Sequence, residues 1–413
     1  MKPEAKLRTG LLGAHLSHSF SPRIHAALAT YSYELFEKKE GEVGDFLKNG
    51  DFDAINVTIP YKKTVMPYLD GISDEAQRIG AVNTIVRRPD GSLWGHNTDY
   101  EGFSDLVADL GIPLAGKKVL VLGSGGASRT AVTVASDLGA RAVVVISRNG
   151  VDNYGNIDRH ADAEILINAT PVGMYPNNGV SPLSLDALPH LEGVLDMIYN
   201  PARTALLLDA AARGIPSRNG LLMLVSQARR AAERFLGRAI PDTEVQRITA
   251  EIARDTQNIL LIGMPGCGKT TLGTRLAKDL GRTFVDTDTE IEKMAGMPIP
   301  EIFATKGEVA FRALETEVLS HFSKQSALVI ATGGGVVTQP RNLPLLKQNS
   351  RVLFLDAPPE ALPTAGRPLS QARTPAVLYA ERLPLYRAAA DAIIPVTRDI
   401  EDNLKKIKEA LKA

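Results

Sequence analysis

The eight residues GMPGCGKT at positions 263–270 constrain the fold of this chain more than any other stretch. They match the pattern G-x-x-x-x-G-K-[ST], follow the apolar run NILLI and precede the helical stretch TTLGTRLAKDLG. Between a strand and a helix, such glycines let backbone N–H groups surround phosphates at the helix N-terminus. The loop therefore predicts an α/β domain that binds ATP or GTP, with Lys269 at the terminal phosphates and Thr270 at Mg²⁺.

A second glycine-rich turn, GSGGAS at 123–128, lies in the first half of the chain. It follows the apolar run KKVLVLG, but Ser128 occupies the third position of G-x-G-x-x-G, so the motif alone is a weak sign of a dinucleotide site. One strand later, the run ISRNG places Arg148 where an NAD site carries an acidic residue. Arg148 therefore favours the 2′-phosphate of NADP, with a solvated surface arginine as the alternative.

The length of 413 residues exceeds one ordinary hydrophobic core and predicts two or three domains. Residues 1–100 alternate short apolar runs with helical stretches, which indicates a small α/β unit. Residues 101–220 continue with a helix and buried strands such as RAVVVIS, which is typical of a doubly wound Rossmann fold. Two helical stretches at 221–253 complete the first unit, RDTQ at 254–257 is the plausible linker, and residues 257–413 form a third domain. The predicted fold class is α/β throughout.

The composition argues against several classes of protein. Lys+Arg and Asp+Glu both number 47, so no overall charge favours nucleic acid or an anionic membrane. The longest apolar runs have the length of a strand and are too short for a membrane span. The single cysteine, Cys267, excludes an intramolecular disulfide and a multi-cysteine metal site. Since the N-terminus shows no export signal, we expect a protein of the reducing cytoplasm.

Three segments after the phosphate loop carry further polar groups. FVDTD places Asp286 and Asp288 beyond a second strand, GEVAFRALE places Arg312 on a helix, and ATGGGVV ends a strand in three glycines. Asp288 taken alone could equally be a helix N-cap. Together with the phosphate loop, these segments resemble shikimate kinase, and the similarity covers residues 257–413.

This resemblance implies a role for each matching position. Asp288 would bind ring hydroxyls of shikimate and orient the one that attacks ATP, and Gly334 would approach the ring closely. Arg312 and Arg382 would bind the carboxylate, because the planar guanidinium forms bidentate, charge-assisted hydrogen bonds. The implied metal ligands are Thr270 and Asp286, and the implied ATP contacts are Gly263, Gly266, Cys267, Gly268, Lys269, Thr270, Thr271 and, in a lid, Arg367.

Seven segments of the first half form a second and highly specific pattern. They are SHSFSP, NVTIPYKK, GAVNT, GHNTDYEGF, NATPVGM, DMIYNP and GLLMLVSQA. Together they resemble shikimate dehydrogenase, over residues 7 to about 240. The resemblance implies that Lys62 and Asp99 form the acid–base pair at the carbonyl being reduced. This is chemically reasonable, because an ammonium can protonate the developing alkoxide and a carboxylate can orient the ammonium.

The same resemblance implies the remaining contacts. The implied substrate-binding residues are Ser19, Ser21, Thr58, Lys62, Asn83, Asp99, Tyr199 and Gln227. The implied NADP-binding residues are Gly123, Ser124, Gly125, Gly126, Ala127, Ser147, Arg148, Met197 and Gly220. Only about twenty residues separate Arg148 from Asn168, fewer than this family usually has, so the crossover is short for a parallel connection. Arg148 and its neighbours must then account for most of the recognition of the 2′-phosphate.

The two resemblances together imply a bifunctional enzyme of aromatic amino-acid biosynthesis. The first half would reduce 3-dehydroshikimate to shikimate with NADPH, and the second would phosphorylate shikimate with ATP and Mg²⁺. One rival is an NAD-dependent quinate/shikimate dehydrogenase fused to a kinase of another small hydroxy acid, against which Arg148 argues. Another is a regulatory protein that binds ligand without turnover, against which Lys62, Asp99, Lys269 and Asp288 argue. The expected partners are small molecules, and a homo-oligomer is left open.

Overall fold

The computed structural model describes residues 4–17, 19–362 and 374–412. By spatial proximity, these residues divide into two compact units. The first unit runs to Val172 and adds Ser181–Tyr199 and Asp209–Ile252. The second contains Gly173–Val180, Asn200–Leu208 and the chain from Ala253 onward. No described helix combines the length and apolar character needed to cross a membrane.

The first sheet of the first unit is mixed, with the strand order β2-β1-β3-β5-β6-β4. Its strands are β1 (Arg8–Gly13), β2 (Ser32–Glu37), β3 (Ala54–Val57), β4 (Gly71–Ile72), β5 (Thr84–Arg87) and β6 (Leu93–His96). The short helices of this region are η1 (Glu4–Lys6), α1 (Ser21–Leu28), η2 (Glu40–Glu42), α2 (Val43–Asn49), η3 (Met66–Tyr68) and α3 (Asp74–Ile79). Strand β3 is buried along its whole length, whereas the edge strand β2 is largely exposed, since it pairs only with β1.

The second sheet is fully parallel, with the order β11-β10-β9-β7-β8. Its strands are β7 (Lys118–Leu122), β8 (Ala142–Ile146), β9 (Ile165–Asn168), β10 (Gly193–Asp196) and β11 (Ser217–Arg218). The accompanying helices are α4 (Thr98–Leu110), α5 (Gly126–Asp137), η4 (Tyr154–His160), η5 (Leu185–Ala187), α6 (Ala205–Ala212), α7 (Leu221–Leu236) and α8 (Asp242–Thr256). The strand order, with β7 between β8 and β9, is that of a doubly wound sheet.

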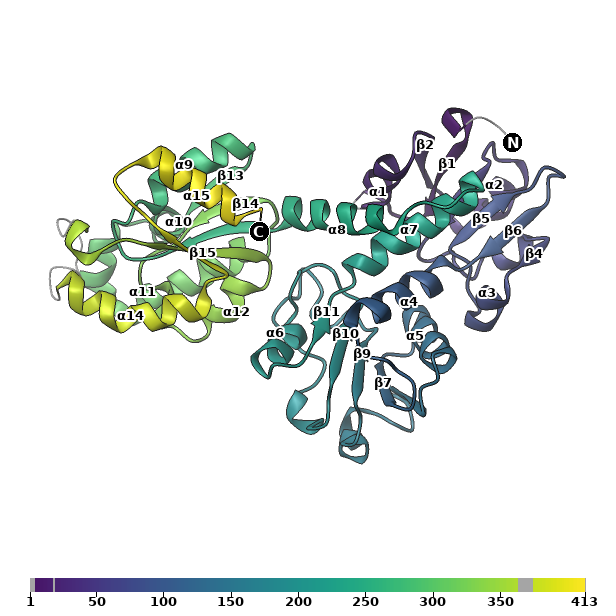
Figure 1. Cartoon of the computed structure of the whole chain (residues 1–413), viewed down its shortest axis with the longest axis horizontal. Coiled ribbons are helices and arrows are strands. Elements are labelled where there is room, and N and C mark those ends of the chain that lie inside the picture. The colour runs from purple at the N-terminus through teal and green to yellow at the C-terminus, as the bar shows by residue number, and fades with distance from the viewer. Residues whose placement is uncertain (1–3, 18, 363–373, 413) are drawn as a thin grey trace. The chain divides into compact units, whose positions relative to one another are not determined.

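Helices α4 and α7 pack closely side by side (Figure 1). The approach depends on Gly102 of α4, because a Cβ atom there would lie 2.9 Å from the Cβ of Gln227 in α7. Helix α7 also contacts α1 and β5, and α4 contacts β10 and β11. The two helices therefore bring residues of both sheets into one site.

The segment predicted as the linker follows directly on the boundary between the two units, and it is largely helical. Helix α8 continues through Thr256, so RDTQ at 254–257 is helical except at its last residue, directly before β12 (Asn258–Ile262). Arg282 explains why the helix extends so far, because its guanidinium donates to the carbonyl of Arg254 at 2.6 Å and to that of Gln257 at 2.8 Å. These bonds satisfy carbonyls that the helix end would leave free. The short crossover after Arg148 contains the 3₁₀ helix η4 in place of an α-helix.

The second unit contains one parallel sheet, with the order β13-β14-β12-β15-β16. The further strands are β13 (Thr283–Asp286), β14 (Leu328–Ala331), β15 (Ser350–Asp356) and β16 (Ala392–Pro395). The helices are α9 (Lys269–Leu280), α10 (Thr287–Ala295), α11 (Ile299–Ser323), η6 (Val336–Thr338), α12 (Asn342–Lys347), η7 (Pro359–Ala361), α14 (Pro375–Ala389) and α15 (Ile400–Ala410). Figure 1 shows α9 and α15 on one side of the sheet and α11, α12 and α14 on the other. Strands β12 and β14 are completely buried between these layers, and the predicted α/β class is confirmed.

Candidate active sites

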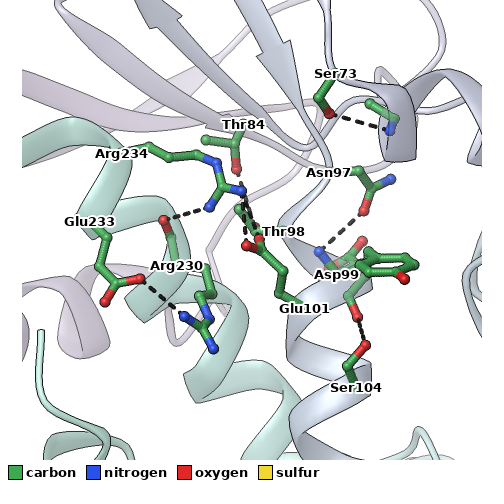
Figure 2. Close-up of polar contacts among 12 residues, drawn as sticks. Ser73, Thr84, Asn97, Thr98, Asp99, Glu101, Ser104, Arg230, Glu233 and Arg234 are labelled. Atoms are coloured by element: carbon green, nitrogen blue, oxygen red, sulfur yellow. Dashed lines mark hydrogen bonds and ion pairs between the residues drawn. The ribbon is translucent and has the colours of Figure 1, made fainter. Parts of the chain in front are cut away.

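The predicted acid–base pair of the first unit joins a loop to a helix N-terminus. Lys62 lies in the turn after β3, and its Nζ donates to Oδ2 of Asp99 at 2.7 Å. Asp99 lies in the first turn of α4, where the N-cap Asn97 accepts from its backbone N–H at 3.1 Å (Figure 2). Asn97 is itself fixed, because it donates to the carbonyl of Ala81 at 2.9 Å. A capped helix end thus holds the carboxylate that orients the lysine.

A buried hydrogen-bond network holds Asn83 next to this pair. Its Oδ1 accepts from the N–H of Thr98 at 2.8 Å and from the hydroxyl of Thr84 at 3.0 Å. The two threonine hydroxyls also contact one another at 3.2 Å, as Figure 2 shows. Because donors of the protein already bond to the amide oxygen of Asn83, a ligand would contact this side chain through its Nδ2 donor.

Three of the predicted substrate-binding residues, Ser19, Ser21 and Tyr199, lie around α1. The side chain of Ser19 accepts from the backbone N–H of Ser21 at 3.2 Å, which fixes the loop at the start of the helix. Between these serines, the ring of Phe20 packs edge-to-face against Tyr199, with 6.0 Å between ring centroids. Burial raises the pKa of Tyr199, so its hydroxyl stays protonated and can donate. The fold therefore brings Tyr199, which follows β10, to the two serines.

The other two predicted substrate residues lie on the same elements as this site. Thr58 follows β3, where its N–H donates to the carbonyl of Leu12 at 2.9 Å, four residues before Lys62. Gln227 lies on α7 and packs against Gly102 of α4, the helix that also carries Asp99. The side-chain amide of Gln227 donates to the carbonyl of Leu224 at 2.8 Å. This bond leaves the side-chain oxygen of Gln227 as an acceptor for a ligand hydroxyl.

The glycine-rich turn after β7 has the geometry that a dinucleotide needs. Gly123 has φ +104°, a conformation that favours glycine, and α5 begins at Gly126. The side chain of Ser128 is buried, 2% exposed, so the third motif position faces the interior and a small residue suffices there. Gly220 abuts Met197, because a Cβ atom at Gly220 would lie 2.1 Å from the Met197 carbonyl oxygen. The exposed turn residues Ser124, Gly125, Gly126 and Ala127 leave α5 with an open N-terminus, as a pyrophosphate requires.

Ser147 and Arg148 follow β8, as predicted, beside a residue that the sequence did not single out. Burial raises the pKa of Tyr154 at the start of η4, while the positive charge of Arg148 acts in the opposite direction. The short crossover therefore places the ring of Tyr154 close enough to Arg148 for an electrostatic interaction between them. Arg129, on the first turn of α5, has a buried Nε that lacks a hydrogen-bond partner in the described part of the chain.

The phosphate loop of the second unit connects β12 to α9. Gly268, the N-cap of α9, has φ +95°, which a residue with a side chain rarely adopts. The ammonium of Lys269 donates to the carbonyls of Gly263 and Met264, both at 2.9 Å, so it lies within the loop. The side chain of Cys267 is buried behind the loop, 7% exposed, so any contact with a nucleotide would come from its backbone.

Thr270 and Asp286, predicted as metal ligands, lie next to one another. The hydroxyl of Thr270 donates to Oδ2 of Asp286 at 2.7 Å. Hydroxyl and carboxylate oxygens are the donors that Mg²⁺ prefers, and Mg²⁺ usually keeps other positions for water and substrate phosphate. The pair therefore fits the ion. Among the described residues, no group of three or more His, Cys, Asp or Glu residues could hold a metal on its own.

Asp288 is not the helix N-cap that the sequence left open. Asp286 is the cap of α10, and its Oδ1 accepts from the N–H of Asp288 at 3.0 Å. Burial, together with the nearby charge of Asp286, raises the pKa of Asp288 to about 6, although Lys269 and Arg312 partly offset this. A carboxyl with such a pKa can accept a proton from a substrate hydroxyl near neutral pH.

Glu315 is a second buried carboxyl at this site, and the sequence analysis missed it. It is 1% exposed and accepts from Arg312 at 2.8 Å, and burial raises its pKa. Among the residues that the structure describes, Oε1 of Glu315 and Oδ1 of Asp288 are buried without a hydrogen-bond partner. Both lie within 2.9 Å of a Cβ atom placed on Gly333, so they face the same point. The i, i+3 spacing of Arg312 and Glu315 on one helix was the signal available.

A single cavity of about 530 Å³ collects most of the predicted kinase residues. Its lining includes Gly266, Gly268, Lys269, Thr270, Thr271, Asp286, Asp288, Arg312, Gly334 and Arg382. Gly263 and Cys267 do not line it. Arg367 lies outside the described residues. The cavity therefore joins a phosphate loop to a chamber with a carboxylate base and two arginines.

Comparison with known proteins identifies a family for each half of the chain. Residues 11–85 match the family model "Shikimate dehydrogenase substrate binding domain". The NADP(+)-dependent shikimate dehydrogenase of Clostridium beijerinckii is 38% identical over 243 residues, covering 54% of this chain and 90% of that protein. The chain belongs to the shikimate dehydrogenase family. Residues 265–412 match the family model "Shikimate kinase", so the expected fusion of the two enzymes is confirmed.

Solved structures of shikimate dehydrogenases have the same fold as the first half. Shikimate dehydrogenase 1 from Peptoclostridium difficile, known from a crystal structure, is 37% identical in sequence, and its structure matches with a TM-score of 0.54. The matched region covers 59% of this chain and 97% of the Peptoclostridium chain. The enzyme of Thermus thermophilus, solved in complex with NADP(H) and shikimate, is 32% identical, with a TM-score of 0.53 and coverages of 59% and 99%. The fold therefore matches that of shikimate dehydrogenases over nearly their full length.

Proposed function

We propose that this chain catalyses two consecutive reactions. The first is the NADPH-dependent reduction of 3-dehydroshikimate to shikimate, and the second is the ATP-dependent phosphorylation of shikimate to shikimate 3-phosphate. The observation that carries the proposal is that one chain assembles both acid–base centres, the Lys62–Asp99 pair and the buried Asp288 carboxyl opposite Arg312. The relatives named above support the first reaction, and the kinase family match supports the second.

In the first reaction, Lys62 is the proton donor to the substrate. Bound NADPH supplies the hydride that adds to the carbonyl carbon. The ammonium of Lys62 protonates the oxygen that becomes the new hydroxyl, and the carboxylate of Asp99 keeps Nζ in position at 2.7 Å. Asn83 donates from Nδ2 to a ring hydroxyl, while Ser19, Ser21 and Tyr199 bind the substrate carboxylate. Arg148 binds the 2′-phosphate and so favours NADPH over NADH.

In the second reaction, Asp288 accepts the proton of the attacking hydroxyl. ATP supplies the phosphoryl group, and Mg²⁺ held at Thr270 and Asp286 neutralises phosphate charge. Lys269 leaves the loop carbonyls that it contacts and binds the terminal phosphates. Arg312 and Arg382 bind the shikimate carboxylate, and Glu315 holds Arg312 in place through the bond of 2.8 Å.

We further propose the division of labour along the chain. Residues 1–100, completed by the helices of 221–253, form the substrate-binding part of the dehydrogenase, and residues 101–220 form its NADP-binding part. Residues 257–413 form the kinase. The separate sheets of these regions support the division. The cytoplasmic location and any homo-oligomer stay predictions.

The direct test uses the full chain in one incubation. We expect 3-dehydroshikimate, NADPH and Mg-ATP to yield shikimate 3-phosphate, identified by mass spectrometry, with NADPH oxidation followed by absorbance. Omitting ATP should stop the sequence at shikimate. A second incubation with shikimate, quinate and NAD⁺ tests the rival dehydrogenase. If shikimate accumulates without its phosphate when ATP is present, the kinase half of the proposal is wrong.

A further inference from the structure

Tyr386 of α14 is a fully buried tyrosine in the kinase unit. Its hydroxyl is hydrogen-bonded to the turn Gly333–Gly335, which lines the cavity described above. Its side chain is 0% exposed, and its ring stacks on Phe354 of β15 with 4.8 Å between centroids. The hydroxyl lies 2.5 Å from the carbonyl oxygen of Gly334 and 3.8 Å from the sulfur of Met264 in the phosphate loop. Burial raises the pKa of Tyr386, so the hydroxyl keeps its proton and donates it to the carbonyl. A phenylalanine would fill the same apolar space without the cost of burying a hydroxyl. What the hydroxyl adds is its hydrogen bond to the turn.

The turn of Gly333–Gly335 is confined on two sides. A Cβ atom on Gly334 would lie 2.5 Å from Pro265 of the phosphate loop, and one on Gly335 would lie 2.4 Å from the guanidinium of Arg312. The turn therefore touches the loop that holds ATP and an arginine that binds the acceptor. Since the peptide group is planar, fixing the carbonyl oxygen of Gly334 also fixes the opposite direction of the next N–H group.

Arg382 shares this carbonyl with Tyr386, since a carbonyl oxygen can accept two hydrogen bonds. The two side chains lie four residues apart on one face of α14, and Nη1 of Arg382 donates to the Gly334 oxygen at 3.2 Å. The tyrosine bond is the shorter of the two. The two bonds therefore anchor one N–H group of Arg382 and the tyrosine hydroxyl at the same oxygen, and the guanidinium keeps its other N–H groups for a carboxylate.

We propose that Tyr386 is a positioning residue for the acceptor substrate of the kinase. It holds the Gly333–Gly335 turn against the phosphate loop and fixes the Gly334 carbonyl to which Arg382 is also anchored, so that the guanidinium is in place for the shikimate carboxylate. The inference rests on the proposed kinase function, and it concerns binding of the acceptor, not of ATP. Without the hydroxyl, the Gly334 carbonyl loses one of these two bonds, so the turn and the guanidinium anchored to it are held less firmly in the position that binds the carboxylate.

The test is Tyr386→Phe in the full chain. Loss of one hydrogen bond of about 0.5–1.5 kcal/mol corresponds to a rise of about 2- to 12-fold in the KM for shikimate. We expect the KM for ATP and kcat to change less than about twofold, because Lys269 and Thr270 keep their partners. Reduction of 3-dehydroshikimate by the same preparation measures the amount of folded chain independently.

A matched control lies on the same helix. Tyr379 also has a bonded hydroxyl, but it donates to Oδ1 of Asp356 at the end of β15, at 2.8 Å. Tyr379→Phe removes the same atom and should leave the KM for shikimate unchanged. A selective rise in the KM for shikimate in Tyr386→Phe alone would support the inference.

Two results would overturn it. One is an unchanged KM for shikimate in Tyr386→Phe. The other is an equal rise in the KM values for ATP and shikimate with a fall in kcat, since this would show that the hydroxyl only stabilises the unit. If the unaltered chain neither binds shikimate by calorimetry nor phosphorylates it, the proposed kinase function itself is wrong, and the inference is overturned with it.

Discussion

Replacing Asp288 by asparagine should stabilise the kinase unit while it removes phosphorylation. The side chain is half-buried with its Oδ1 enclosed, and its pKa in the folded protein is about 6, against the usual 3.8 of an aspartate. The folded state therefore binds the proton more tightly than the unfolded chain. The stability contributed by the protonated carboxyl is fully present below pH about 4 and is lost as the pH rises through about 6.

The magnitude follows from the difference between these two pKa values. A difference of about 2 pKa units lowers the free energy of unfolding by about 3 kcal/mol at pH 8, where Asp288 is ionised in both the folded and the unfolded chain. Asparagine has nearly the same shape and cannot ionise, so Asp288→Asn avoids this cost. We expect the variant to be more stable than the native chain by up to about 3 kcal/mol at pH 8 and about equally stable at pH 4.

Urea unfolding measures the effect, provided that the two units are distinguished. Trp94, the only tryptophan of the chain, lies in β6 of the first unit, so its fluorescence follows that unit alone. Far-ultraviolet circular dichroism follows both units, and the transition that fluorescence does not detect belongs to the kinase. The activity assay on the same samples should show reduction but no phosphorylation.

Asp279→Asn is a control of opposite sign in the same unit. The hydrogen bond from Lys408 lowers the pKa of Asp279, so its carboxylate stabilises the folded state above its pKa. Its replacement should slightly destabilise the kinase unit at pH 8. The reasoning is refuted if Asp288→Asn destabilises the kinase unit at pH 8, or if the difference from the native chain is the same at pH 4 and pH 8.

Three further outcomes are expected. Lys62→Ala should lower the rate of 3-dehydroshikimate reduction by about 10² to 10⁴ and leave phosphorylation of added shikimate intact, and a parallel loss of both rates would contradict separate sites. Arg148→Ala should reduce the preference for NADPH over NADH by about ten- to a hundredfold in kcat/KM, since one charge-assisted phosphate contact is lost; unchanged preference would point to Arg129 instead. The kcat/KM of phosphorylation should fall as the pH drops through about 6, because Asp288 must be ionised to accept a proton, and a rate that is flat between pH 5 and 8 would rule out this role.

Both nucleotide-binding turns could be predicted from local sequence. The phosphate loop is contained in eight residues between one strand and one helix, so its geometry depends on glycines and on neighbours in the chain. The α/β class followed from the alternation of apolar runs with helical stretches for the same reason. That RDTQ continues a helix could not be predicted, because its carbonyls find their donors in the distant Arg282.

The acid–base chemistry was decided by tertiary structure. Asp288 taken alone could have capped a helix, and only the resemblance to shikimate kinase favoured a role at the substrate. Packing made Asp286 the cap and removed Oδ1 of Asp288 from solvent, and this desolvation, with the charge of Asp286, raises its pKa. Tyr386 gave no signal either, because a tyrosine at a buried helix position is usually an ordinary core residue. Spacing along the chain can place a group on an element, but its pKa and its partners depend on groups that only folding brings within a few ångströms.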